Sequence, residues 1–279
     1  MNPKTTRRGF LGGAAGLAVV GGAEAGAGAA AAIEDIRLGV ASYSLREFSH
    51  RLAIRMIQRL NVRYVSVKEF HLPYRSAPEE LARGAKDFAK AGLEIVSGGV
   101  IYMQQDDEED IRRYFEYAKT CEMPMMAIGP THETLPKIEK FVKQYNIRVA
   151  IHNHGPEDKH FPSPEVALKA VRDMDPRVGL CIDVGHTVRT GTSAVESIQT
   201  AGSRLLDVHI KDLRDLKDAK SQCPVGDGAM PVAEIFKLLK KMTYRGCVNL
   251  EYEIEGEDPL LGMAKSFAYM RGMLAGLRG

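Results

Sequence analysis

The sequence predicts a single closed barrel of eight parallel strands and eight helices, the (β/α)8 TIM-barrel fold. Apolar strand-like runs alternate with amphipathic helical stretches from Ile36 onward, and eight of each fit within residues 33–279. Several runs end in His, Asp or Glu, as barrel strands do where they reach the active-site face. The alternative is an open doubly wound sheet. That fold normally carries a phosphate-binding glycine loop after its first strand, and GVASYSLRE (39–47) contains none.

The individual elements follow from short apolar runs and from helical periodicity. The expected strands cover residues 36–43, 63–68, 93–101, 124–129, 147–154, 178–184, 205–211 and 247–253. The expected helices cover residues 47–60, 78–91, 107–121, 132–145, 164–173, 193–202, 232–242 and 258–276.

Local signals mark some ends of these elements. Ser163 followed by Pro164 is a typical helix start, and Gly92 and Gly202 are expected to end the helices before them. The longest loop, residues 212–231, follows the seventh strand on the face where barrel active sites lie. A long loop there is typical of a lid or a substrate wall.

The first residues differ from the rest of the chain. NPKTTRRGFL (2–11) is basic with paired arginines, and a weakly apolar, Ala/Gly-rich stretch with small-x-small sites such as Ala23-Glu24-Ala25 follows. The pattern is typical of a twin-arginine export signal; a plain Ala/Gly tail is the alternative. The apolar stretch is too short and glycine-rich for a stable membrane span. We therefore assign residues 1–32 to a signal and 33–279 to the barrel, and expect a periplasmic or exported protein.

Composition excludes some classes of function. The chain has 44% hydrophobic and 27% charged residues, a net charge of +2 and no Lys/Arg block after the signal, so nothing indicates a nucleic-acid partner. The four cysteines are widely spaced without a CxxC pair, which argues against a zinc knuckle or redox pair. We expect buried free thiols at Cys181 and Cys247; a periplasmic disulfide is the alternative, and the sequence selects no pairing.

Four candidate metal ligands end the strand-like runs of the second half. They are His152, Asp183, His209 and Glu251, separated by 31 (183−152), 26 (209−183) and 42 (251−209) residues, about one strand, helix and loop each. A parallel barrel gathers a site in this way, one residue from each successive strand. Two imidazoles and two carboxylates suit a divalent transition ion, with manganese expected first and zinc, cobalt or iron as alternatives.

Further polar residues lie near the same strand ends. His154 is expected on the same face as His152 and is a candidate acid or base. His186 follows the Gly185 turn as a candidate substrate-binding group, and Lys211 is a candidate to stabilise an oxyanion. Lys68 and His71, after the second strand, are candidate substrate-binding residues; for each residue the alternative is a structural role. The VGDG turn (225–228) either contacts sugar hydroxyls or is a simple tight turn, which we favour.

These motifs resemble a known family. IHNHG, CIDVGH, DVHIKD followed by VGDG, and NLEYE, with a weaker match at VKEFHLP, are similar to the xylose-isomerase-like barrels of sugar phosphate isomerases and epimerases, a group that includes AP endonucleases and inosose-converting enzymes. The resemblance covers 36–276. It implies that Asp183, His209 and Glu251 hold a metal and that His186 contacts substrate. The strand-five position departs from it, because His152 stands where the epimerases have Glu, which removes one of their two bases.

The sequence therefore predicts a metal-dependent isomerase- or epimerase-type enzyme that removes a proton beside the carbonyl of a sugar or keto-sugar. Glu251 is the expected acid/base, with His152 or His154 as the other. The first alternative is a lyase or hydratase that performs β-elimination on keto-sugars or 3-keto-glycosides. A non-catalytic carbohydrate-binding barrel is the second. A DNA-repair endonuclease is disfavoured by the near-neutral charge and the few histidines. A homo-oligomer is compatible with the sequence.

Overall fold

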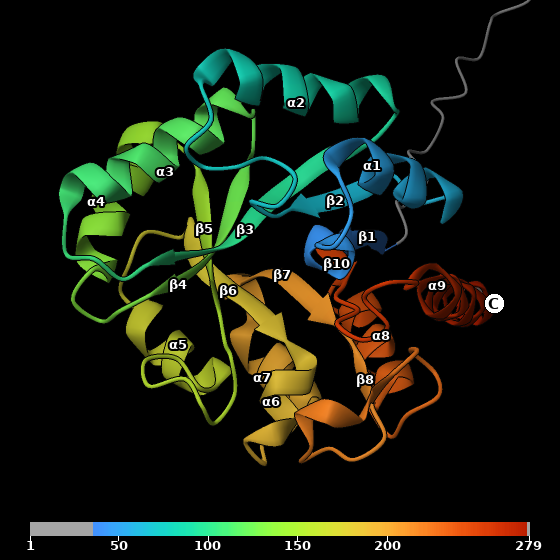
Figure 1. The fold of residues 1–279 in the computed structure, drawn as a ribbon. Coiled ribbons are helices and arrows are strands. Elements are labelled where there is room, and N and C mark those ends of the chain that lie inside the picture. The colour runs from blue at the N-terminus through green and yellow to red at the C-terminus, as the bar shows by residue number, and fades with distance from the viewer. Residues whose placement is uncertain (1–35, 278–279) are drawn as a thin grey trace, which may run out of the picture. The chain divides into compact units, whose positions relative to one another are not determined.

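Eight parallel strands close into a barrel in the computed structural model, which describes residues 36–277 (Figure 1). The first strand, β1 (Arg37–Ala41), pairs on one side with β2 (Tyr64–Val67) and on the other with β10 (Cys247–Leu250), so the sheet has no free edge. This closure confirms the (β/α)8 prediction and excludes the open sheet.

All eight expected strands and all eight expected helices are present, with bounds that differ by a few residues. The remaining barrel strands are β3 (Glu94–Met103), β4 (Met125–Pro130), β5 (Arg148–His152), β6 (Val178–Asp183) and β7 (Leu205–Ile210). The expected helices are α1 (His50–Arg59), α2 (Pro78–Lys90), α3 (Glu108–Thr120), α4 (Leu135–Tyr145), α5 (Pro164–Val171), α7 (Ala194–Ala201), α8 (Val232–Lys241) and α9 (Leu260–Gly276). Sequence patterns did not predict α6 (Val184–Arg189), which begins directly after β6.

Side chains alternate along each strand between the outer core and the barrel interior. On β5, Val149 and Ile151 pack outward into the main hydrophobic core beneath the helices. Ala150 points inward and belongs to a separate small apolar cluster, and His152 follows it on the inner face. The inner face is otherwise largely polar, with Asp207 accepting hydrogen bonds from Ser97 and from Asn249 (3.2 and 2.8 Å).

The local signals behave as expected. Ser163 is the N-cap residue of α5, and Pro164 occupies its first turn. Gly92 and Gly202 follow α2 and α7 with φ of 76° and 54°, the left-handed region in which glycine is favoured after a helix.

The long loop after β7 folds into a small hairpin of β8 (Asp212–Leu213) and β9 (Gln222–Cys223). The Asp212 carboxylate accepts hydrogen bonds from the backbone amides of Gly226, Gly228 and Met230 (2.9–3.1 Å). These bonds hold the VGDG segment as a tight turn, the reading that we favoured.

The predicted export signal, residues 1–32, lies outside the described residues. Within residues 36–277, no helix combines the length and the apolar character needed to cross a membrane. All four cysteines are buried and free, which confirms the expectation for Cys181 and Cys247.

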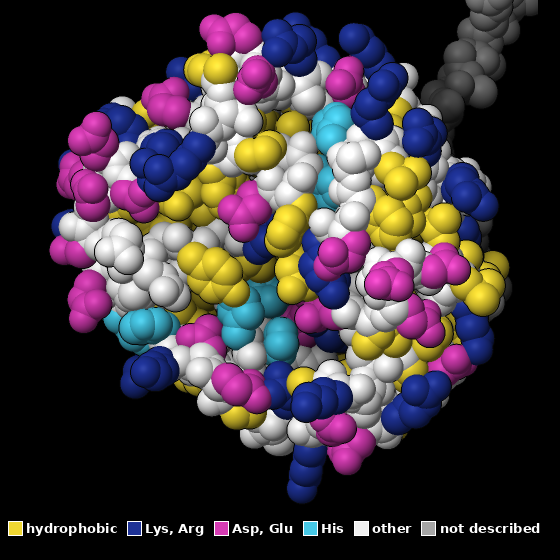
Figure 2. Space-filling model, viewed as in Figure 1, with side chains coloured by type: hydrophobic (Ala, Val, Ile, Leu, Met, Phe, Trp, Pro, Cys, Tyr) yellow, Lys and Arg dark blue, Asp and Glu magenta, His cyan; other side chains and the backbone are white. Residues whose placement is uncertain are grey.

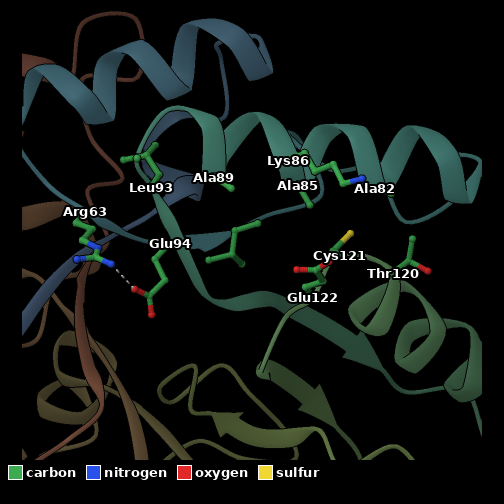
Figure 3. A pocket seen from close by; sticks show the side chains of 12 residues that line it. Arg63, Ala82, Ala85, Lys86, Ala89, Leu93, Glu94, Thr120, Cys121 and Glu122 are labelled. Atoms are coloured by element: carbon green, nitrogen blue, oxygen red, sulfur yellow. Dashed lines mark ion pairs between the residues drawn. The ribbon is translucent and has the colours of Figure 1, made fainter.

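A cavity of about 620 Å³ lies between α2, the start of β3 and the end of α3 (Figure 3). Alanines of α2, namely Ala82, Ala85 and Ala89, line one side, and the Arg63–Glu94 ion pair lies at one end. Glu94 is the first residue of β3, so this cavity lies at the amino end of the strand, away from the strand ends that carry the candidate ligands.

Candidate metal centre and active site

The four expected ligands converge at the carboxyl ends of neighbouring strands. His152 ends β5, Asp183 ends β6, His209 lies on β7 and Glu251 follows β10. Nε2 of His152 is 3.1 Å from Nδ1 of His209 and 3.7 Å from Oδ2 of Asp183. Oε2 of Glu251 is 3.3 Å from Nδ1 of His209, and all four ligand atoms lie within 4.8 Å of one another.

This donor set fits a divalent ion. Tetrahedral coordination at about 2.0–2.1 Å places neighbouring ligand atoms about 3.4 Å apart, close to the separations observed. None of the four side chains is more than 9% exposed, and Oδ2 of Asp183 has no hydrogen bond of regular geometry. Buried polar atoms are normally hydrogen-bonded, and a metal ion would satisfy these groups instead. Two nitrogens and two oxygens suit a transition ion better than calcium.

Lys211 lies against the carboxylates of this cluster. Its Nζ is 3.0 Å from Oδ2 of Asp183 and 3.1 Å from Oε2 of Glu251, and it also contacts Glu253. Burial alone would lower the pKa of Lys211, but the three carboxylates raise it well above its ordinary value. A Cβ at Gly185 would lie 2.6 Å from Cγ of Lys211, so this glycine makes room for the lysine chain.

The charge on Glu251 is fixed by the same neighbours. Burial raises the pKa of its carboxyl group, but the Lys211 ammonium and the His209 imidazole outweigh burial and hold that pKa well below its usual range. Glu251 is therefore ionised and able to accept a proton.

His186 is held at the start of α6. Its backbone amide donates to Oδ1 of Asp183 (2.7 Å), which caps this short helix. Nη1 of Arg189 lies 3.1 Å from its Nδ1; because a guanidinium only donates, Nδ1 accepts and Nε2 carries the hydrogen. Burial, aided by Lys211, lowers the pKa of His186 to about 3, so the ring is neutral.

His154 belongs to a chain of three side chains. The hydroxyl of Tyr102 is 3.0 Å from Nε2 of His154, and the two rings stack with centroids 5.5 Å apart. On the other side, Nδ1 of His154 lies 3.3 Å from Oδ2 of Asp158. Burial would raise the pKa of Asp158, but His154 and two backbone amides lower it to about 2. This carboxylate therefore favours the hydrogen on Nδ1, which leaves Nε2 to accept from Tyr102.

Two adjoining cavities open beside the cluster, one of about 280 Å³ and one of about 320 Å³. His186 and Glu253 line both, and Glu251, His152 and His154 line the first. Histidine side chains gather in a hollow near the middle of the face shown in Figure 2. The second cavity is lined by residues of α6 and the β8–β9 hairpin, including Arg189, Lys220 and Gln222.

Lys68 and His71, the two candidate substrate-binding residues after the second strand, lie in different surroundings. Lys68 lines the first cavity, donates to the Val100 carbonyl (2.7 Å) and lies 5.6 Å from the ring centre of Tyr102; burial lowers its pKa. His71 is 2% exposed, with Nδ1 3.0 Å from the Ser42 hydroxyl and Nε2 3.1 Å from a backbone carbonyl. Its contacts are internal, so the structure does not bring His71 to the cavity.

Sequence patterns missed several residues of the site, namely Tyr43, Tyr102, Asp158, Arg189, Gln222 and Glu253. Glu253 carried a usable signal, because it lies two residues beyond Glu251 in NLEYE. Asp158 carried none, because it reaches the site only through a contact with His154. Tyr102 lines the first cavity and also contacts His154.

A family comparison agrees with this geometry. Residues 54–273 match the family model of the xylose isomerase-like TIM barrel. The chain belongs to this family. The match includes all four candidate metal ligands, and it confirms the resemblance seen in the sequence motifs.

Individual proteins that are similar to this chain have low sequence identity to it. The chain is 26% identical over 149 residues to an inosose dehydratase of Clostridium botulinum, covering 48% of this chain and 49% of the relative. It thus spans about half the length of the curated relatives it matches. Among solved structures, the IolI protein with a bound zinc atom gives a TM-score of 0.71 at 16% identity, covering 86% and 99% of the two chains. The probable 3-DHS dehydratase AsbF of Bacillus anthracis gives 0.69 at 13% identity, covering 84% and 99%. These two likenesses concern the fold alone.

Proposed function

We propose that this protein is a divalent-metal-dependent enzyme that removes a proton beside the carbonyl of a sugar or keto-sugar and then expels a β-hydroxyl group as water. The observation that carries the proposal is the buried set of His152, Asp183, His209 and Glu251 beside a cavity of about 280 Å³. The dehydratase names of the sequence relatives support elimination over the alternatives.

Glu251 is the proposed base. It is the one carboxylate of the cluster that lines the cavity, and the pKa shift described above keeps it ionised. When bound, a divalent ion supplies Lewis-acid polarisation of the substrate carbonyl, which acidifies the neighbouring C–H bond. Lys211, 3.1 Å from Oε2 of Glu251, stabilises negative charge that develops beside it.

His154 is the proposed acid, and Tyr102 delivers its proton. Tyr102 lines the cavity, and its hydroxyl is hydrogen-bonded to Nε2 of His154. A proton taken from solvent by His154 can pass through the Tyr102 oxygen to the departing hydroxyl. Proton abstraction by Glu251 and protonation of that hydroxyl together yield an unsaturated ketone and water.

The position of His152 argues against epimerisation by two opposed bases. His152 occupies the place of the second carboxylate, and its Nε2 faces the three other ligands at 3.1–3.9 Å. It therefore serves as a ligand and leaves Glu251 as the single base. Aldose–ketose isomerisation is the second candidate, because one base that keeps its proton can return it to the adjacent carbon.

Incubation with keto-sugars and 3-keto-glycosides in D₂O, followed by NMR, tests the proposal. Elimination gives an unsaturated product, or a released aglycone when the leaving group is a glycosidic oxygen. Deuterium in an otherwise intact or isomerised sugar supports the second candidate. A protein that releases no product and exchanges no proton with any of these compounds is a non-catalytic sugar-binding barrel.

The metal is proposed to be manganese, with zinc, cobalt and iron as alternatives, because two carboxylates and two imidazoles suit each of them. Metal analysis of the protein as purified, followed by reconstitution of the stripped protein with each ion, ranks them. The zinc in the IolI structure supports a divalent ion in this fold without selecting one.

The proposed location is the periplasm, reached through the twin-arginine route. The paired Arg7 and Arg8 support it. Replacement of both by lysine is expected to retain the full-length chain inside the cell, and immunoblots of cell fractions measure this. Equal export of the two forms would remove the support.

A further inference from the structure

Cys181 lies directly beneath the metal cluster. It is on β6, two residues before Asp183, so both side chains point into the barrel about 6.6 Å apart along the strand. Cys181 pairs in register with His152 on β5, and its thiol is completely buried. Burial raises the pKa of this thiol to about 12, so without a metal it is protonated.

The two histidines of the cluster have unused nitrogens. Nδ1 of His209 faces Glu251 and His152, whereas its Nε2 has no hydrogen bond of regular geometry, and the Cys181 side chain interacts with this ring. Nδ1 of His152 is likewise buried without a partner. Both histidine side chains are at most 2% exposed, so solvent does not satisfy these atoms. Fully buried nitrogens without partners are exceptional and point to a ligand.

The cysteine and the two histidines form a second set of converging donors. One ligand atom from each of His152, Cys181 and His209 lies within 4.8 Å of the others. Among residues 36–277, Cys121, Cys223 and Cys247 belong to no such group. Cys181 therefore combines a free thiol, two imidazoles and complete burial.

We propose that His152, Cys181 and His209 form a second metal position, one layer deeper than the carboxylate cluster, that takes soft divalent ions. Thiolate and imidazole ligands favour zinc and other thiophilic ions, whereas carboxylates favour harder ions such as manganese. On binding, the thiol releases its proton to solvent and the sulfur becomes a ligand. The barrel thus offers two overlapping sites that differ in chemical preference.

The two sites compete because they share both histidines. A neutral imidazole offers one lone pair to a metal, so an ion held by Cys181 takes His152 and His209 away from an ion at Asp183 and Glu251, which stay paired with Lys211. Soft ions are therefore expected to displace a harder ion from the carboxylate site. If the proposed function holds, they also inhibit the enzyme; the position itself does not depend on that function.

The test uses Cd²⁺, a soft ion whose bonds to thiolate absorb in the ultraviolet. Metal-free protein is titrated with Cd²⁺ and, separately, with Mn²⁺, and binding is followed by absorption and calorimetry. Cys181→Ser and Cys181→Ala are compared with the wild type, and Cys223→Ser, which alters a buried thiol outside the group, is the matched control.

We expect a charge-transfer band that saturates at one Cd²⁺ in the wild type and in Cys223→Ser and is absent from both Cys181 variants. Cd²⁺ affinity should fall on the order of tenfold or more in those variants, and Mn²⁺ affinity should stay within about twofold. One Cys181 variant whose melting curve shows a folded protein is enough for this comparison. A band that survives the loss of Cys181, or Cd²⁺ binding without a band in the wild type, overturns the proposal. Neither readout uses substrate, so the result is independent of the enzymatic assay.

Discussion

Nζ of Lys211 lies 3.0 Å from Oδ2 of Asp183, inside the barrel and almost fully shielded from water. An ammonium group thus lies against a carboxylate that is expected to hold a metal ion. Without an ion, Lys211 is the cation that stabilises this carboxylate and that of Glu251. With an ion, part of that role passes to the metal.

Lys211→Met should therefore destabilise the metal-free protein more than the loaded one. Loss of Lys211 leaves the buried Asp183 carboxylate without its ammonium partner, which costs about 3–5 kcal/mol. Added Mn²⁺ should restore part of this stability, so its effect on the melting temperature should be larger in the variant than in the wild type. Equal shifts in both proteins would contradict the role assigned to Lys211.

Glu251→Gln should abolish both solvent exchange of the substrate proton and product formation. The amide cannot accept a proton at neutral pH, and loss of a general base costs about 10²–10⁴-fold in rate. NMR in D₂O measures exchange and product together. Glu257→Gln, an exposed change in the same loop, is the control. Wild-type exchange in Glu251→Gln would assign the proton abstraction to another group.

Tyr102→Phe should separate the two halves of the reaction. The ring and its stacking on His154 remain, but the hydroxyl proposed to protonate the departing group is lost. Product formation should slow by about 10²-fold while exchange of the proton by Glu251 continues. Tyr269→Phe, on the outer helix α9, is the control. If exchange and elimination slowed equally, Tyr102 would act in binding rather than in proton delivery.

His71 should make the protein less stable as the pH falls through 6.5. Burial lowers the pKa of His71 in the folded state, so below the unfolded pKa of 6.5 the unfolded chain binds more protons and unfolding becomes easier. His71→Asn should lose about 1–3 kcal/mol near pH 7.5, from broken internal hydrogen bonds. Its stability should then fall less steeply than that of the wild type between pH 7 and pH 5. Urea unfolding at several pH values measures both effects, and parallel slopes would exclude a contribution from His71.

The fold was predictable because its signal is repeated eight times. Each strand shows its apolar run, and the outward residues, such as Val149 and Ile151, alternate with inward ones as the sequence suggests. The short helix α6 was missed because it starts at the end of β6 without a loop, so VGHTVR reads as a turn. The β8–β9 hairpin was missed because each strand has only two residues.

The candidate site was predictable only where residues follow strands directly. Asp183 and Glu251 end apolar runs, so their place at the mouth follows from the barrel. The place of Asp158 depends on a contact with His154, and that of Arg189 on a contact with His186. His71 shows the opposite case: it follows a strand, yet its ring turns into the protein and bonds to Ser42. Local sequence does not specify these side-chain directions.

The polar interior of the barrel affects which substitutions can change the activity of the protein. The main hydrophobic core lies between the strands and the helices, and residues such as Val208 and Leu250 belong to it. Asp207, Asn249 and the metal cluster lie on the other side of the same strands. Substitutions inside the barrel therefore alter chemistry while the outer layer maintains the shape. New activities can arise there one residue at a time, without redesign of the scaffold that carries them.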